Sequence, residues 1–595
     1  MYSKHKRPYE SESLAPNKRL RSNLQDIFSS NQLSGKRTQE LINDIADAGN
    51  EELEALRGRV GGHSSRKLKS AFLKRNQWPS LYWARIRVLN VRTAVEEYQQ
   101  CAFILPHEYL GVLAKLGTMD MLLDKSGLDP VSRAHLDQCE RRAGEALIPV
   151  GLWGDGVPVN WDRTESVETV SLNLPGQAGA HKDLRLPVTG VPHKQFGEHT
   201  WDDIMEVVAW SLNHAAANTR PNCRHDNTAW LATDTKRRKL AETSLVLGAR
   251  AALVEVRGDW KMFGEVFRFP KHNTKAGCCW LCTCTPEQVD HVFTVFITFV
   301  PLISRLLLRR LEITIQQIPV AWIDPLEVRE YGSGAGWRAQ RLSHWDVLHR
   351  ILQSGQRVSP LLQVVWVDIC IFRIDWLHAV DQGVAADYLG NLFRLISSKL
   401  PGRSLKVRTA ALWVRIQAGY TANNTADRLQ NLVPTMIKQD KKAPKLRSSA
   451  AQCRALIPIS NTLASQLLND ADPVECAAKA GMHHLHQCYM ALSHGSIFAA
   501  DVLREHSTKF AAQYVALEAF AADPHSWKVK PKLHLFLELC SDGSRPAMFW
   551  NYRDEDFGGS VAHLSRRRGG CLSVKAFSGN MLDRFKIKQP VVRMI

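Results

Sequence analysis

Two aspartates that follow glycines at the ends of strand-like runs are the residues best placed to do chemistry in this chain. Residues 147–153 lead into Gly154-Asp155-Gly156, and residues 251–257 lead into Gly258-Asp259. A short apolar run bounded by glycine is typical of a buried strand, which here would deliver a carboxylate at its end. Two converging carboxylates repel each other, and a pair of Mg²⁺ ions would relieve that repulsion and bind the attacking and leaving oxygens of a phosphodiester. The alternative is an aspartate in a tight glycine-rich turn.

The elements around these aspartates predict how they would meet. Hydrophobic patterns indicate strands at 147–154, 166–174, 184–192 and 251–257, with a helix at 201–217 before the last strand. Three antiparallel strands, a helix and a fourth strand is the order of the ribonuclease H-like fold, in which the first and fourth strands are neighbours. We therefore expect an α/β core with a mixed sheet that brings Asp155 and Asp259 together.

Four motifs follow the second aspartate. They are Cys278-Cys279-Trp280-Leu281-Cys282-Thr283-Cys284, Asp375-Trp376-Leu377-His378 followed by Gly383-Val384, Lys530-Pro531-Lys532-Leu533-His534, and the acidic Asp554-Glu555-Asp556. Their order resembles that of DDE/D transposases of the CACTA and Plavaka type over roughly residues 147–560, and it is similar to transposase-derived open reading frames of protists. The resemblance implies a ribonuclease H-like core interrupted by a largely helical insertion, with Mg²⁺ or Mn²⁺ as cofactor.

The resemblance also implies a third acid after the insertion. We choose Glu555, with Asp554 and Asp556 as competitors, and the alternative is an acidic turn on the surface. Asp375 and His378 would lie on roughly one face of a helix. The resemblance makes them a motif that supports the active site, whereas a plain interpretation is a helix cap followed by a satisfied histidine.

Cys279 and Cys282 have the spacing that places two thiolates on one tetrahedral Zn²⁺. Two more ligands are needed, and the chain has no second C-x-x-C pair. The residues considered for completing the site are Cys284, His272, Cys223, His225 and His378. The alternative is a group of buried free thiols.

Composition points to an anionic partner. The 595 residues carry a formal net charge of +18, and nucleic acid is the simplest such partner. The 13 cysteines lack the dense spacing of a secreted disulfide framework, so a reducing compartment is expected. The longest apolar run, Val292–Ser304, is too short to cross a bilayer, and no membrane partner is predicted. Basic clusters at 4–7 and 18–21 suggest nuclear import, or else a solvated terminus.

Several basic residues are candidates for contact with DNA. Arg66, Lys67 and Lys69 lie on a predicted basic helix, Arg566, Arg567 and Arg568 form a cluster near the C-terminus, and Arg257 and Lys261 flank the second aspartate. For each group the alternative is a solvated surface. The resemblance adds a homo-oligomer assembled on transposon ends as a further partner.

The domain organisation follows from these patterns. We expect a disordered basic tail at 1–30, a helical region that contacts DNA at 31–146, the first part of the core at 147–286, an irregular insertion at 287–336, a mainly helical insertion at 337–525, a return to the core with the final acid at 526–570, and a basic tail at 571–595. Two functions stay open: cleavage and joining of DNA phosphodiesters, or a catalytically inactive nucleic-acid-binding or scaffold protein that keeps the fold.

Overall fold

The computed structural model describes most of the chain. The described residues are 16–30, 32–74, 77–115, 119–160, 162, 164–177, 184–245, 249–271, 277–284, 340–438, 442–493, 499–541, 543–565 and 573–589. The irregular insertion expected at 287–336, the cluster Arg566, Arg567 and Arg568, and His272 lie outside these residues. No helix of the described residues is long and apolar enough to cross a membrane.

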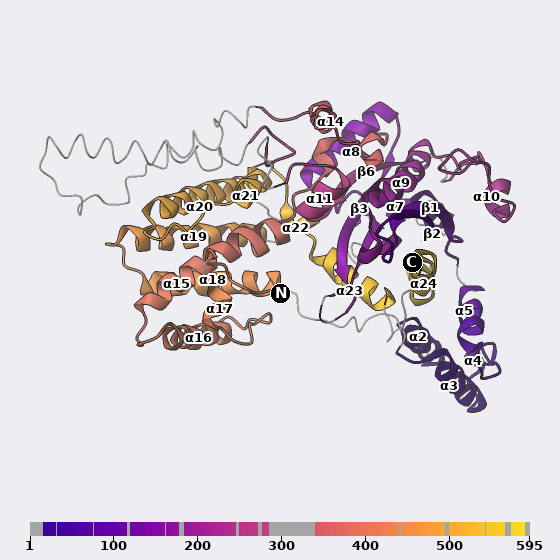
Figure 1. The fold of residues 1–595 in the computed structure, drawn as a ribbon, viewed down its shortest axis with the longest axis horizontal. Coiled ribbons are helices and arrows are strands. Elements are labelled where there is room, and N and C mark those ends of the chain that lie inside the picture. Colours follow the sequence, from indigo (N-terminus) through magenta and orange to yellow (C-terminus); the bar gives the residue numbers. More distant parts are fainter. Residues whose placement is uncertain are drawn as a thin grey trace, which may run out of the picture.

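A four-stranded mixed sheet forms the centre of the core (Figure 1). Its strands are β3 (Leu147–Pro158), β4 (Ser166–Asn173), β5 (Arg185–Pro192) and β6 (Arg250–Arg257), in the order β5-β4-β3-β6. β3 pairs antiparallel with β4 and parallel with β6, and β4 pairs antiparallel with β5. The predicted strands and the predicted pairing of the first with the fourth are confirmed.

The sheet is covered on both faces, since every residue of β5 and all but the first residue of β4 and β6 are buried. Such strands read as nearly continuous apolar runs, which is why the sequence located them. The helices that pack against the sheet are α8 (Pro130–Ala143), α9 (Thr200–Ala217), α23 (Tyr552–Ser565) and α24 (Val574–Lys588). β3 continues beyond its predicted end, so Asp155 lies within the strand opposite Thr169.

The N-terminal region is only partly helical, and two predictions for it are wrong. Helices α2 (Pro16–Ser29), α3 (Gly35–Asp47), α4 (Glu51–Glu54) and α5 (Ser64–Lys74) come first, so residues 16–29 are not a disordered tail. β1 (Tyr82–Leu89) and β2 (Glu96–Phe103) then form an antiparallel hairpin where helix was expected. Alternate residues of β1 are buried, the period of a strand. Helices α6 (Pro106–Lys115) and α7 (Met119–Leu123) follow.

The C-terminal residues are also misassigned by the sequence. The expected basic tail at 571–595 instead contains α24, which packs against β2 and β5. Phe577, Met581 and Phe585 of this helix are buried in the main core, and the Ser578 hydroxyl accepts a hydrogen bond from the Ala102 amide at 2.9 Å. Apolar residues spaced by four therefore make this basic segment part of the core.

The predicted helical insertion is helical in the structure. Its elements are α14 (His344–Gln353), short turns at Pro360–Gln363 and Ile369–Ile371, a π-helix η7 (Leu377–Val384), α15 (Ala385–Lys399), α16 (Leu405–Ala422), α17 (Pro434–Ile437), α18 (Ala450–Leu467), α19 (Pro473–Ser493) and α20 (Ala500–Phe520). Helices α15 to α20 form a lobe beside the sheet (Figure 1). The chain returns through α21 (Lys532–Ser541) and α22 (Pro546–Phe549) to α23, which contacts β3.

Candidate functional site

The two Gly-Asp pairs sit at the same edge of the sheet. In the parallel pairing of β3 with β6, Trp153 is opposite Arg257, so the next residues along both strands are the glycines and then the aspartates. A Cβ at Gly154 would come within 2.5 Å of the Met262 side chain, and one at Gly258 within 2.7 Å of it. Met262 therefore packs over both glycines, and a larger residue at either position would have to displace its flexible side chain.

Asp155, His378 and Glu555 form a compact group at this edge. Each offers one ligand atom, and the three atoms lie within 4.8 Å of one another. Asp155 comes from β3, His378 from η7 and Glu555 from α23, three elements that are far apart in the sequence. His378 Nε2 is 3.7 Å from Glu555 Oε1. The structure thus brings the predicted first and third acids together with the histidine of the supporting motif.

The electrostatics of this group favour a cation. The pKa of Asp155 is raised well above its ordinary value, first because the half-buried carboxylate loses much of its contact with water and then because of the negative charges of Glu555 and Asp259. The Glu555 side chain is 42% exposed, but the partial loss of solvent around its carboxylate still raises its pKa, although the charge of His378 opposes that effect. A raised pKa means that the ionised carboxylates are destabilised in the folded chain, and a divalent ion bound between them would stabilise that ionised form.

Asp259 lies beside this group and also caps a helix. It precedes α11 (Trp260–Val266), and its Oδ1 accepts a hydrogen bond from the Met262 amide at 2.6 Å as the helix N-cap. Its charge contributes to the raised pKa of Asp155, so the two carboxylates are near each other as predicted. The compact ligand group, however, contains His378 in the place that the sequence gave to Asp259.

The Asp375 carboxylate fixes the position of His378. Its Oδ2 is 2.6 Å from His378 Nδ1 and 3.0 Å from the His378 amide nitrogen. Burial lowers the pKa of His378, but the hydrogen bond and charge of Asp375 more than compensate and raise it to about 9. Oδ1 of Asp375 also accepts a hydrogen bond from the Asn551 amide at 2.9 Å, just before α23. Both interpretations of this motif, the helix cap and the support of the site, fit this geometry.

Asp381 makes a second connection between η7 and α23. Its carboxylate accepts hydrogen bonds from the hydroxyls of Tyr489 and Tyr552, the latter at 2.7 Å. The group is fully buried, and that burial raises its pKa to about 6. Since Tyr552 is the first residue of α23, the helix that carries Glu555 is held at its start by two buried carboxylates.

Glu555 faces the site because its neighbour is anchored in the core. Asp554 is fully buried, and its carboxylate accepts hydrogen bonds from Arg185 of β5 and from Arg257 of β6, the latter at 3.0 Å. Successive helix residues are about 100° apart around the axis, so anchoring Asp554 inward turns Glu555 toward the strand ends. Arg257, expected to contact phosphate, is instead buried in this ion-pair network together with Glu255.

A cavity of about 310 Å³ opens beside His378, and Asp155 and Glu555 are not part of its lining. Asp259, His378, Lys261 and Lys532 line it. Lys261 is mostly exposed, and its ion pair with Glu265 is long, at 3.9 Å, so the amine can still contact an anion. The Lys532 amine donates a hydrogen bond to the His378 carbonyl at 2.7 Å, and burial lowers its pKa to about 8. The sequence motif that contains Lys532 was recognised, but no role at the site was given to it.

The cysteine motif forms a second cluster with a ligand that the sequence did not identify. Cys279, Cys282 and His534 each place a ligand atom within 4.8 Å of the others, and all three are buried. His534 lies on α21, and its Nε2 is 3.4 Å from Cys282 Sγ. Hydrogen bonds from the thiols of Cys279 and Cys284 lower the pKa of Cys282.

Two of the other residues considered for that cluster lie elsewhere in the structure, and His272 is outside the described residues. His378 belongs to the carboxylate group, and His225 forms a 2.5 Å hydrogen bond with Tyr82 at the N-terminal hairpin. Of the residues considered, Cys284 is the one that touches the cluster, through Cys282. His534 belongs to the Lys530–His534 motif, and that motif was the sequence feature that could have identified it as a ligand.

The predicted basic helix is α5. Arg66 and Lys67 are exposed on it. Lys69 is instead bound to Asp583 of α24 at 2.8 Å and to Asn580 at 3.1 Å, so it joins two helices of the protein. No protein-family model matches the chain, and no curated protein is significantly similar to it.

Proposed function

We propose that this chain is a DDE-type, transposase-like protein with a ribonuclease H-like core, which cleaves and joins DNA phosphodiesters with divalent metal ions. The observation that carries the proposal is the meeting of Asp155 and Glu555, two acids separated by most of the chain, beside the C-terminal end of β6. The strand order, the helical lobe and the net charge of +18 support the same function.

The donor set fits Mg²⁺ or Mn²⁺. Asp155 and Glu555 supply carboxylate oxygens, which these ions prefer, and the charge of the neighbouring Asp259 adds to the negative potential at the site. When bound, the ions would activate water or a 3′-hydroxyl and stabilise the leaving oxygen. His378, held protonated near neutral pH by Asp375, would not ligate the ion in that form and would instead offset the negative charge of the carboxylates or of a phosphate next to them.

Other residues would bind and orient the DNA strand. Lys261 lines the cavity beside Asp259 with an exposed amine, so it can contact a phosphate oxygen. Lys532 holds the His378 carbonyl and thereby fixes the helix that carries the imidazole. Arg66 and Lys67 on α5 are proposed as outer contacts with the DNA backbone, in a nuclear protein that assembles as a homo-oligomer on DNA ends.

DNA nicking tests this function. The purified full chain should nick supercoiled DNA when Mg²⁺ or Mn²⁺ is present and should be inactive in EDTA. Asp155→Asn should reduce the nicking rate by more than about 100-fold, because the neutral amide cannot hold the ion. Equal activity of the two proteins would show that the nicking does not come from this site.

We also propose that Cys279, Cys282 and His534 bind a structural Zn²⁺, with Cys284 as the nearest candidate for a fourth ligand. The three residues are buried, which suits a closed structural site more than a catalytic one. The ion would tie the segment 277–284 to α21, which carries Lys532 to the cavity.

Metal analysis tests the zinc site. The chain should be purified with about one equivalent of zinc, and Cys282→Ser should lose most of that zinc and melt at a lower temperature. Cys476→Ser is a matched control, because Cys476 is a free, half-buried cysteine on α19 outside the cluster. Wild-type zinc content in the Cys282 variant would rule out this assignment.

One observation favours the second function, an inactive DNA-binding or scaffold protein. Asp259 uses an oxygen to cap α11, and the imidazolium of His378 already pairs with Glu555. In an inactive protein these contacts would replace the metal ions permanently. Thermal unfolding separates the two functions, since an active site should raise the melting temperature when Mn²⁺ is added and a site closed by His378 should not.

A further inference from the structure

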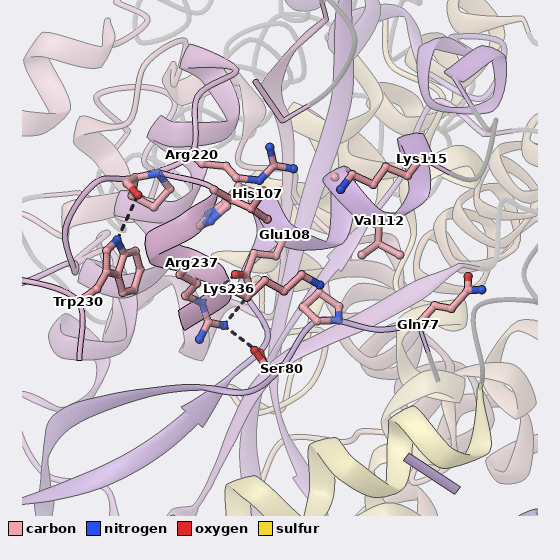
Figure 2. A pocket seen from close by; sticks show the side chains of 14 residues that line it. Gln77, Ser80, His107, Glu108, Val112, Lys115, Arg220, Trp230, Lys236 and Arg237 are labelled. Carbon is pink, nitrogen blue, oxygen red and sulfur yellow. Dashed lines mark hydrogen bonds and ion pairs between the residues drawn. The ribbon is translucent and has the colours of Figure 1, made fainter. Parts of the chain in front are cut away.

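A second basic pocket lies away from the carboxylate group. It has a volume of about 190 Å³ and is formed by α6, the loop around Pro221 and Trp230, and α10 (Thr235–Lys239) (Figure 2). Its charged lining consists of four basic side chains and one carboxylate: Lys115, Arg220, Lys236, Arg237 and Glu108. The pocket therefore has an excess of positive charge.

Two of these charges neutralise each other. Arg237 binds both oxygens of Glu108, at 2.8 and 2.9 Å, and also donates to the Ser80 carbonyl at 2.9 Å (Figure 2). Asp234 accepts a further hydrogen bond from Arg237 at 3.1 Å. This network holds α10 against α6 and leaves Glu108 with little free charge. The attraction for an anion must come from the other three cations.

Those three cations are differently placed. Lys115 and Lys236 are exposed, come from two different helices, and form no ion pair with any other described residue. Arg220 is partly buried, and its Nη1 donates to the Thr243 hydroxyl at 3.0 Å, so the guanidinium is fixed in place. Burial lowers the pKa of Arg220 because it destabilises the charged guanidinium, and a bound anion would stabilise that charge.

The remaining lining is apolar and narrow. Pro79, Val112, Pro221 and Leu240 contribute it, and walls of low polarity strengthen the field of the three cations. Pockets for whole small-molecule ligands usually exceed about 300 Å³. A volume of about 190 Å³ suits one phosphate group and part of a sugar better than a complete nucleotide.

We propose that this pocket binds a backbone phosphate of a DNA strand, through Lys115, Lys236 and Arg220. The choice of DNA as the source of the phosphate rests on the proposed function. Helix α9 lies between the two sites. At its start, Asp202 forms an ion pair at 3.0 Å with Arg268, which follows α11 and Asp259 in the sequence. Its C-terminal end at Ala217 is three residues before Arg220 of the pocket. The 18 residues of α9 span about 27 Å, so DNA that reaches both sites would cover about eight base pairs.

DNA binding in EDTA tests the pocket without any requirement for catalysis. The full chain is titrated into a labelled duplex of about 20 base pairs at several salt concentrations, and fluorescence anisotropy is measured. The double variant Lys115→Gln/Lys236→Gln should bind about tenfold more weakly, and the slope of log K against log salt should fall by about 2. Arg238→Gln/Lys239→Gln is the matched control, because these exposed neighbours on α10 carry the same charge but do not line the pocket.

Three results would overturn the inference. The first is an unchanged DNA affinity of the pocket variant, and the second is an equal loss of DNA affinity in the control variant. The third is that the wild type binds thymidine monophosphate or inorganic phosphate tightly and the pocket variant does not, while both bind DNA equally well. The last would identify a site for a free phosphate compound. A protein that fails to nick DNA but shows the predicted loss in EDTA would support this inference and contradict only the proposed catalysis.

Discussion

Glu555→Gln should lose Mg²⁺-dependent DNA cleavage by more than about 100-fold and should still fold. The glutamine keeps the size of the side chain but cannot supply the negative oxygen that a divalent ion needs beside Asp155. Because the pKa of Glu555 is raised in the folded chain, its ionised form is disfavoured there, and the neutral variant should be no less stable than the wild type without metal. Melting curves with and without Mn²⁺ measure this, and the variant should lose the stabilisation by Mn²⁺.

Asp556→Asn provides the control for that experiment. Asp556 is the next residue on α23, is exposed, and is absent from the compact ligand group. It carries the same charge as Glu555, so a general effect of lost charge on DNA binding would appear equally in both variants. Full cleavage by Glu555→Gln, or an equal loss in Asp556→Asn, would remove Glu555 from the proposed catalytic set.

The core could be predicted because its signals are local. Strands buried on both faces appear as apolar runs, and the glycines at 154 and 258 mark where Met262 packs. The hairpin of β1 and β2 was missed although Tyr82, Ala84, Ile86 and Val88 alternate inward with the period of a strand. The prediction of a helical region over 31–146 covers this hairpin, whereas the preceding helix α5 ends at Lys74.

Long-range partners were much harder to predict. Glu555 was chosen through a family resemblance, because no local pattern distinguishes it from the acids on either side. His534 contacts Cys282 across 252 residues, and spacing within the cysteine motif says nothing about so distant a ligand. His378 was placed as support, whereas its ligand atom lies within 4.8 Å of those of Asp155 and Glu555. Such groupings depend on how α23 and η7 pack, which only the folded chain determines.

Asp554 should be more important for stability than the acid beside it. The carboxylate is fully buried between Arg185 and Arg257, and Arg257 also binds Glu255. Removing one partner from a buried ion pair leaves an uncompensated charge and costs about 3–5 kcal/mol. Asp554→Asn should therefore lower the free energy of unfolding by about that amount, measured by urea denaturation, whereas Asp556→Asn, at an exposed position, should lower it by less.

The stabilisation by Asp554 should depend on pH. Burial would raise the pKa of Asp554, but the charges of Arg185 and Arg257 outweigh burial and hold the pKa below its ordinary value of 3.8. A carboxyl whose pKa is lower in the folded state contributes stability above the unfolded pKa and loses it as the pH falls through the folded pKa. The wild-type chain should thus lose this contribution only below about pH 4, and the difference in stability between wild type and Asp554→Asn should narrow there. A constant difference across that range would mean that the aspartate acts through its shape and hydrogen bonds. A narrowing difference would show that its charge anchors α23, and with it the orientation of Glu555 toward Asp155.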